Sequence, residues 1–137
     1  MILTDENFAI VERDTHIGKW VMESKRLDFD QNALPTYLKY FNKNDVLLNV
    51  GANIGCYAYA FIDKAKEIVC IEPNDEAFEC LQFNLSSYKN IILLHTAVSN
   101  KQHPYTIHNE YDNVGMAYVE ERISDKYTIT IDDLKMN

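Results

Sequence analysis

Three mostly apolar runs mark the middle of the chain, at residues 46–50, 67–72 and 91–96. None of them alternates strictly between apolar and polar residues, which is typical of strands buried on both faces of a parallel sheet. Residues 56–62 and the segment after Asn74 lie between the runs and have the apolar spacing or the capping of helices. This order of strand, helix, strand, helix and strand predicts an α/β doubly wound sheet with right-handed crossovers.

The chain before these runs has a mixed pattern. Residues 8–30 predict short strands and turns, and the apolar residues at 19–22 belong to one of these strands. Residues 32–41 predict a helix, because their apolar positions have helical spacing and Pro35 suits a first turn.

After residue 99 the pattern changes again. Apolar and polar residues alternate at 105–107 and at 127–131, which predicts strands with one face in water. Residues 116–121 are expected to pair with them, and 132–134 predict the start of another helix. The C-terminal part is therefore expected to be an antiparallel hairpin region.

A chain of 137 residues suits a single domain. Within it we distinguish an N-terminal flap (1–31), a cofactor-binding core (32–99) and the hairpin region (100–137).

The charge of the chain narrows the list of partners. Its formal net charge is −8, and its longest basic cluster is the pair Lys25 and Arg26. An acidic surface repels a phosphate backbone, which is bound through lysine and arginine. We therefore expect no nucleic-acid partner.

Cys56, Cys70 and Cys80 show neither the spacing of a metal site nor an even number for disulfides, so buried thiols in a reducing compartment are expected. The four histidines also lack metal-ligand spacing, and no metal is expected. No apolar run is long enough for a signal peptide or a membrane span. The sequence thus predicts a soluble, cytoplasmic protein without membrane contact.

The most informative feature is a glycine turn after the first buried run, followed by an acidic residue at the end of the second. Ligands of open α/β sheets bind outside the carboxyl ends of the strands, where such loops meet. A dinucleotide site requires the pattern Gly-x-Gly-x-x-Gly, whose glycines let the backbone approach the pyrophosphate. Here the pattern starts at Gly51, but Asn53 and Cys56 occupy the second and third glycine positions.

S-adenosylmethionine carries no phosphate and fits these residues better. Gly51 and Gly55 leave room for its methionine part, and the Asn53 amide offers a donor and an acceptor. Glu72 follows Gly51 by 21 positions and can accept hydrogen bonds from both ribose hydroxyls. This acid spacing alone also suits a nicotinamide cofactor, so a nicotinamide-dependent enzyme stays an alternative.

Several motifs resemble the FkbM family of S-adenosylmethionine-dependent methyltransferases, which are class I, Rossmann-like enzymes. They are Leu48–Gly55 (LNVGANIG), Ile71–Phe78 (IEPNDEAF), Thr96–Asn100 (TAVSN), Asn113–Gly115 (NVG) and Tyr127–Leu134 (YTITIDDL). The resemblance implies methyl transfer to a hydroxyl of a small molecule, a sugar or a glycan.

The resemblance also implies roles for individual residues in binding the cofactor. Gly51, Asn53 and Gly55 would hold its methionine part, Glu72 its ribose, Pro73 and Asn74 the ribose and adenine edge, and Ala97 and Val98 the adenine. At Asn49 the family usually has an acid that helps to hold the ammonium group of the cofactor. No residue of the chain matches a catalytic base of the family.

The family continues beyond the segment at 132–134 with a strand that ends in an Asp-x-Glu-Gly motif. In the strand order of class I methyltransferases, the first strand pairs with a strand from that later part. We therefore expect 46–50 to be an apolar edge strand in this chain, which is a truncated homologue or has its edge covered by a partner, such as a second copy. The functional alternative is a non-catalytic homologue that acts as a cofactor-binding or interaction subunit.

Overall fold

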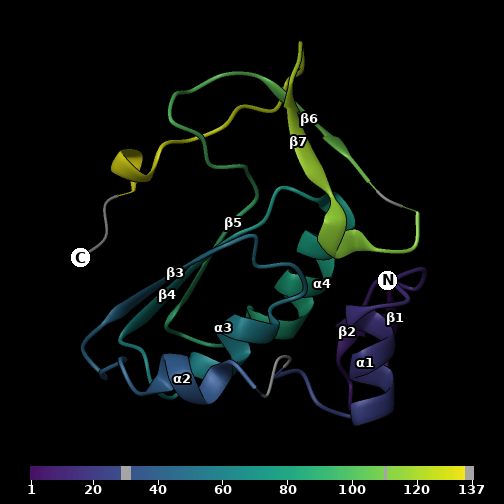
Figure 1. The fold of residues 1–137 in the computed structure, drawn as a ribbon, viewed down its shortest axis with the longest axis vertical. Helices are drawn as coiled ribbons and strands as arrows, with labels where there is room; N and C mark the ends of the chain where they lie inside the picture. Colours follow the sequence, from purple (N-terminus) through teal and green to yellow (C-terminus); the bar gives the residue numbers. More distant parts are fainter. Residues whose placement is uncertain (29–31, 110, 135–137) are drawn as a thin grey trace.

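The computed structural model describes residues 1–28, 32–109 and 111–134, and Figure 1 shows their arrangement. The last residues of the predicted flap (29–31), residue 110 and the end of the hairpin region (135–137) lie outside the described residues. Within the described ranges, no helix combines the length and the apolar character needed to cross a membrane.

The centre of the molecule is a parallel sheet of β3 (Val46–Val50), β4 (Glu67–Ile71) and β5 (Ile91–Leu94), in that order (Figure 1). The crossovers contain α3 (Cys56–Phe61) and α4 (Asp75–Leu85). These elements confirm the predicted α/β fold class. Because the strand order advances in one direction, right-handed crossovers place both helices on the same face, as in one half of a doubly wound sheet.

The main core lies between this face of the sheet and the helices. Ile68 and Cys70 of β4 are fully buried there against Leu81 and Leu85 of α4 and Phe61 of α3. On the opposite face of the sheet, the side chains of β3 and β5 are less covered.

The N-terminal segment forms a hairpin of β1 (Ile2–Leu3) and β2 (Ala9–Ile10), followed by α1 (Ile17–Ser24). The prediction of a strand at 19–22 was therefore wrong. The reason is that the side chains that face the core, Ile17, Trp20 and Val21, have helical spacing, whereas Met22 beside them is exposed.

One amide side chain makes several hydrogen bonds between the predicted flap and the core. Asn84 of α4 accepts a hydrogen bond from the backbone N–H of Ala9 (2.7 Å) and donates to the carbonyl oxygens of Ala9 (3.0 Å) and Ile54 (2.9 Å). It therefore joins β2, α4 and the residue before Gly55 through three hydrogen bonds.

The predicted helix at 32–41 is present as the shorter α2 (Leu34–Leu38), with Pro35 in its first turn. In the C-terminal part, β6 (Tyr105–His108) pairs with β7 (Tyr118–Glu121), which confirms the predicted hairpin. A short 3₁₀ helix, η1 (Val114–Met116), leads into β7.

The predicted strand at 127–131 is reduced to two isolated bridges, between Ile129 and Val98 and between Tyr127 and Pro104. It ends in the 3₁₀ helix η2 (Ile131–Asp133) instead of an α-helix. Thr130 and Asp133 form a capping box there, and this local bonding competes with continuation of the strand.

Candidate functional site

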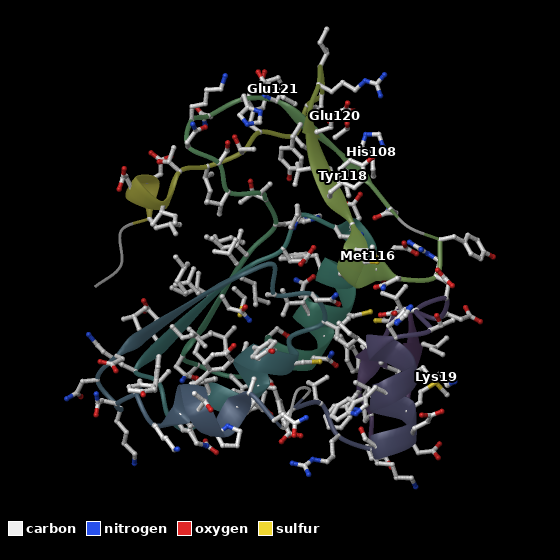
Figure 2. The ribbon with its side chains drawn as sticks, in the orientation of Figure 1. Lys19, His108, Met116, Tyr118, Glu120 and Glu121 are labelled. Carbon is white, nitrogen blue, oxygen red and sulfur yellow. The ribbon has the colours of Figure 1, made fainter. Side chains whose placement is uncertain are left out.

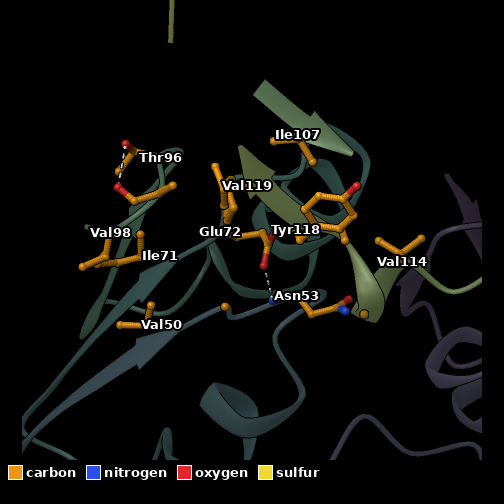
Figure 3. A pocket seen from close by; sticks show the side chains of 15 residues that line it. Val50, Asn53, Ile71, Glu72, Thr96, Val98, Ile107, Val114, Tyr118 and Val119 are labelled. Atoms are coloured by element: carbon orange, nitrogen blue, oxygen red, sulfur yellow. Dashed lines mark hydrogen bonds between the residues drawn. The ribbon is translucent and has the colours of Figure 1, made fainter. Parts of the chain in front are cut away.

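A cavity of about 250 Å³ lies at the carboxyl ends of the parallel strands, beneath the β6–β7 hairpin (Figure 3). Its lower wall comes from the ends of β3, β4 and β5, and its upper wall from the hairpin and η1. The lining residues are Val50, Gly51, Asn53, Ile71, Glu72, Pro73, Thr96, Ala97, Val98, Ile107, Val114, Gly115, Ala117, Tyr118 and Val119.

The turn between β3 and α3 forms the floor of the cavity beside Gly51. The backbone N–H groups of Gly51 (2.8 Å) and Ala52 (3.0 Å) both donate to the carbonyl oxygen of Ile71. Gly51 and Asn53 have positive φ angles of 75° and 50°. Asparagine tolerates this left-handed conformation better than most residues, so Asn53 can occupy a position where a dinucleotide site has glycine.

Glu72 lies at the centre of the cavity wall and is 7% exposed. Its Oε2 accepts the backbone N–H of Asn53 at 2.8 Å (Figure 3). Its Oε1 accepts the backbone N–H of Asn74, also at 2.8 Å. Burial raises the pKa of this carboxyl above its usual value, while the two N–H groups act in the opposite direction. Each oxygen retains a lone pair that can accept a hydroxyl group.

Asn53 also orients its own side chain. Its Oδ1 accepts the backbone N–H of Ile54 (2.7 Å), so the amide nitrogen is turned away from α3. This Nδ2 lies 3.5 Å from the point where a Cβ on Gly115 would stand. The amide therefore lies between the floor of the cavity and its upper wall.

The structure brings six of the nine predicted cofactor residues together around the cavity: Gly51, Asn53, Glu72, Pro73, Ala97 and Val98. The other three, Asn49, Gly55 and Asn74, are not among the residues that line it.

Asn74 is buried as the N-cap of α4, where its side chain accepts the backbone N–H groups of Glu76 (3.0 Å) and Ala77 (3.3 Å). The amide of Asn74 also donates to Oδ1 of Asn109, the residue that directly follows β6. Asn74 therefore caps the start of α4 next to Glu72.

Gly55 is required by helix packing. A Cβ there would stand 2.8 Å from Cδ1 of Leu85 and 3.0 Å from Cδ1 of Leu81, and the φ angle is 99°. Gly51 differs, because a Cβ at that position would meet no atom within 4 Å. Gly55 thus lets α3 approach α4, whereas Gly51 supplies the conformation of the turn.

The side chain of Asn49 points to the helix-covered face of the sheet. It lines a separate hollow with Leu47 and aromatic residues in or next to α2 and α3, and its Nδ2 is buried without a hydrogen-bond partner among the residues that the structure describes.

The upper wall of the cavity was missed by the sequence prediction, apart from the resemblance at Asn113–Gly115. Tyr118 and Val119 line the cavity from β7, and Ile107 lines it from β6. Apolar residues in an alternating strand carry no signal for a ligand, since such positions usually pack against the core. Only the tertiary structure places them over the strand ends.

The ring of Tyr118 is held by its neighbours on the hairpin, which Figure 2 labels. His108 stacks on it with ring centroids 5.0 Å apart and an interplanar angle of 13°, and His108 Nε2 lies 2.8 Å from Oε2 of Glu120. The His108 ring thus packs against one face of Tyr118, which is 56% exposed.

The N-terminal segment holds the upper wall in place. Arg13 forms an ion pair with Glu76 of α4 and donates to the carbonyl oxygen of Tyr111. The backbone N–H of Thr15 donates to the carbonyl oxygen of Asp112 (2.9 Å). The segment before η1 is thereby tied both to α4 and to the chain before α1.

Among the described residues, no group of three or more histidine, cysteine, aspartate or glutamate side chains is placed to hold a metal ion. Cys56, Cys70 and Cys80 are buried and form no disulfide within the described part of the chain, and burial raises the pKa of Cys70 to about 12 and that of Cys80 to about 11.

No protein-family model matches the sequence, and no curated protein matches it either. Several solved structures overlap with part of the fold. One is precorrin 8W decarboxylase from Methanobacterium thermoautotrophicum, with 26% identity, a TM-score of 0.46, and coverage of 69% of this chain and 47% of that one.

Two further structures overlap at lower identity. Precorrin-6y C5,15-methyltransferase from Geobacter metallireducens has 16% identity and a TM-score of 0.44, with coverage of 68% of this chain and 46% of that one. A methyltransferase-like protein from Streptococcus mutans, solved with SAH, has 13% identity and a TM-score of 0.43, with coverage of 50% and 43%. The overlap spans less than half of each of these chains, and at such TM-scores it assigns neither a family nor a ligand to this protein.

Proposed function

We propose that the chain binds S-adenosylmethionine in the cavity beside Glu72 and acts in methyl transfer of the kind the FkbM family performs. The observation that carries this proposal is the chemistry of the lining residues. Glu72 is the one charged side chain among them, and it is buried with an acceptor site left on each oxygen.

A cavity lined by a carboxylate favours a cationic nucleoside without phosphate groups over a dinucleotide. S-adenosylmethionine carries a sulfonium cation, and its two ribose hydroxyls can both donate to one carboxylate. A pyrophosphate would bring negative charge next to Glu72, with no lysine or arginine among the lining residues to neutralise it. The side chain of Asn53 also stands where a pyrophosphate requires bare backbone.

The position of each wall supports an assignment of the parts of the ligand. The ribose lies at Glu72 and Pro73, and the adenine lies against Ala97 and Val98 at the end of β5. The methionine part lies at the turn of Gly51 and Asn53. These assignments follow the resemblance and the order of the walls around Glu72.

When bound, the cofactor would supply an electrophilic methyl group for in-line displacement by an acceptor oxygen. The chain would contribute orientation and exclusion of water. Tyr118 and Val119 of the hairpin cover the cavity and suit the second role. We propose a hydroxyl of a small molecule, a sugar or a glycan as the acceptor, as the resemblance implies.

A non-catalytic, cofactor-binding subunit is the second candidate, and one observation favours it. A hydroxyl acceptor benefits from a general base, but the lining residues offer only Glu72, which this proposal assigns to the ribose, and the phenol of Tyr118.

Titration calorimetry with S-adenosylmethionine, S-adenosylhomocysteine and NAD⁺ tests the proposal. We expect the first two to bind in a 1:1 ratio and NAD⁺ to give no heat of binding. Binding of NAD⁺ alone, or of none of the three, would overturn the proposed ligand. If the first two bind, incubation with methyl-labelled cofactor and a panel of hydroxylated acceptors separates the candidates, because a binding subunit transfers no label.

A further inference from the structure

Among the described residues, β3 lies at the edge of the parallel sheet, and the backbone groups on its outer side can be identified. The N–H of Gly51 donates to Ile71 (2.8 Å), and the carbonyl of Asp45 accepts from Lys66 (3.0 Å), so the odd-numbered residues of this stretch turn their backbone groups toward β4. Backbone groups alternate in direction along a strand. The N–H and C=O groups of Val46, Leu48 and Val50 therefore point to the open edge.

Asn49, in the middle of this edge, has a polar group without a partner. Its Nδ2 is buried and unpaired in the part of the chain that the structure describes. Buried amide groups in folded proteins nearly always have a partner, and an exception calls for an explanation.

The surroundings of Asn49 are apolar and partly uncovered. A hollow of about 360 Å³ lies beside it, lined by Leu47, Tyr37, Tyr40, Phe41, Tyr57 and Phe61. Tyr37 and Tyr40 are 51% and 81% exposed, and on the other face of the sheet Val50 is 52% exposed. Large apolar side chains gathered along an open strand edge are typical of a protein interface.

We propose that two copies of the chain join through β3, as antiparallel neighbours about a two-fold axis at Asn49, to form a continuous six-stranded sheet. In this register Leu48 pairs with Val50 of the second copy, and the outward backbone groups of both residues are satisfied. Asn49 faces Asn49 of the second copy as a non-hydrogen-bonded pair, in which side chains approach most closely. An amide has both a donor and an acceptor, so two asparagines satisfy each other.

The polar group selects this register over its neighbour. A two-fold axis at Leu48 would pair the same strand edges but place Asn49 opposite Leu47 of the second copy. That arrangement leaves both buried amides without a partner. A second copy is favoured as the occupant because Asn49 and the alternating backbone groups complement themselves under two-fold symmetry.

The dimer would also complete the surroundings of the cavity. Val50 and Gly51 end the open edge and line the cavity, so the N-terminal end of the second copy's strand would lie next to it. The dimer does not depend on the identity of the ligand, and it is tested without one.

Single-cysteine substitutions test the register in the 137-residue chain. In a non-hydrogen-bonded antiparallel pair the Cα atoms are about 4.5 Å apart, within the range of a disulfide. Under mild oxidation with oxidised glutathione, we expect Asn49→Cys to form a covalent dimer on a non-reducing gel. Leu47→Cys, which lies on the same face of the strand, and Leu48→Cys, which lies on the other face, are the control variants. Both should run as monomers on the non-reducing gel. The natural cysteines are buried, so the unsubstituted chain is the background control.

Sedimentation equilibrium over a dilution series tests the assembly itself. We expect the unsubstituted chain to dimerise, and Asn49→Asp at neutral pH to raise the dissociation constant about a hundredfold or more, because two like charges would face each other in a buried site. Circular dichroism shows whether that variant is folded. Three outcomes would overturn the proposal. The chain could be a monomer at all concentrations, it could form a dimer that crosslinks through none of the three positions, or Leu48→Cys could crosslink in preference to Asn49→Cys.

Discussion

Glu72 and Asn53 are joined across the ends of two neighbouring strands, because the carboxylate at the end of β4 accepts the backbone N–H of the left-handed residue in the β3–α3 turn at 2.8 Å. One side chain thus supports the shape of the turn and presents acceptor sites to the cavity. The two roles respond differently to substitution and to pH.

The buried carboxyl of Glu72 makes the stability of the fold depend on pH. Burial raises its pKa, so the folded state binds the proton more tightly than the unfolded state. Its contribution to the free energy of unfolding is therefore lost as the pH rises from the ordinary pKa of glutamate through the raised value. We expect that the free energy of unfolding of the Glu72→Gln variant does not show this decrease with pH. Urea denaturation at a series of pH values measures it. Glu79→Gln, on the exposed side of α4, should leave the profile unchanged; the same profile for both variants would contradict the prediction.

Ligand binding should have the opposite dependence on the charge of Glu72. The proposed ribose contact needs the ionised carboxylate, so the affinity for S-adenosylhomocysteine should decrease as the pH falls through the raised pKa. At neutral pH, Glu72→Gln should weaken binding about tenfold to a hundredfold, the equivalent of losing a hydrogen bond to a charged group. Calorimetric titration of both proteins measures this, and unchanged affinity in the variant would remove Glu72 from the ribose site.

The two glycines of the turn should differ in their tolerance of alanine. Gly55→Ala adds a Cβ that clashes with Leu85 and strains a positive φ, and we expect it to lower the free energy of unfolding by about 2–4 kcal/mol. Gly51→Ala meets no atom within 4 Å and should cost only the backbone strain, about 1–2 kcal/mol. Urea denaturation of the pair compares them; equal losses would mean that packing against α4 does not require glycine.

Asn84 should control the attachment of the N-terminal segment. Asn84→Ala removes the three hydrogen bonds to Ala9 and Ile54, and we expect the amide of Ala9 to exchange with solvent at least about tenfold faster. Gln82→Ala, on the exposed face of the same helix, is the control. Hydrogen exchange followed by mass spectrometry measures the effect, and protection of Ala9 equal to that of the control would show that the segment is held by other contacts.

The sequence predicted the sheet and the glycine turn because both depend on local patterns. The strands at 46–50 and 91–94 are mostly apolar runs, and Asn74 has the local signature of an N-cap. The helix at Ile17–Ser24 was missed because three adjacent apolar residues, Trp20 to Met22, obscured a helical face that becomes visible only when the exposure of Met22 is known.

The cavity was predicted in part for a related reason. Its lower wall follows from the strand-to-helix turns, which are local, but its upper wall comes from residues 107–119, far along the chain. No local rule links Tyr118 to Glu72. Because side chains alternate along a strand, Asn49 and Val50 are expected on opposite faces of the sheet. That the Asn49 amide is buried outside the cavity could be seen only once the positions of α2 and α3 were known.

The strand order of the central sheet bears on how the protein folds during synthesis. Each parallel strand pairs with the next one in the chain, so residues 46–94 contain all the strand pairings of this sheet. Domains generally fold from the N-terminal side as they leave the ribosome. The floor of the cavity can therefore form while the hairpin that covers it is still being synthesised, and the site is completed last.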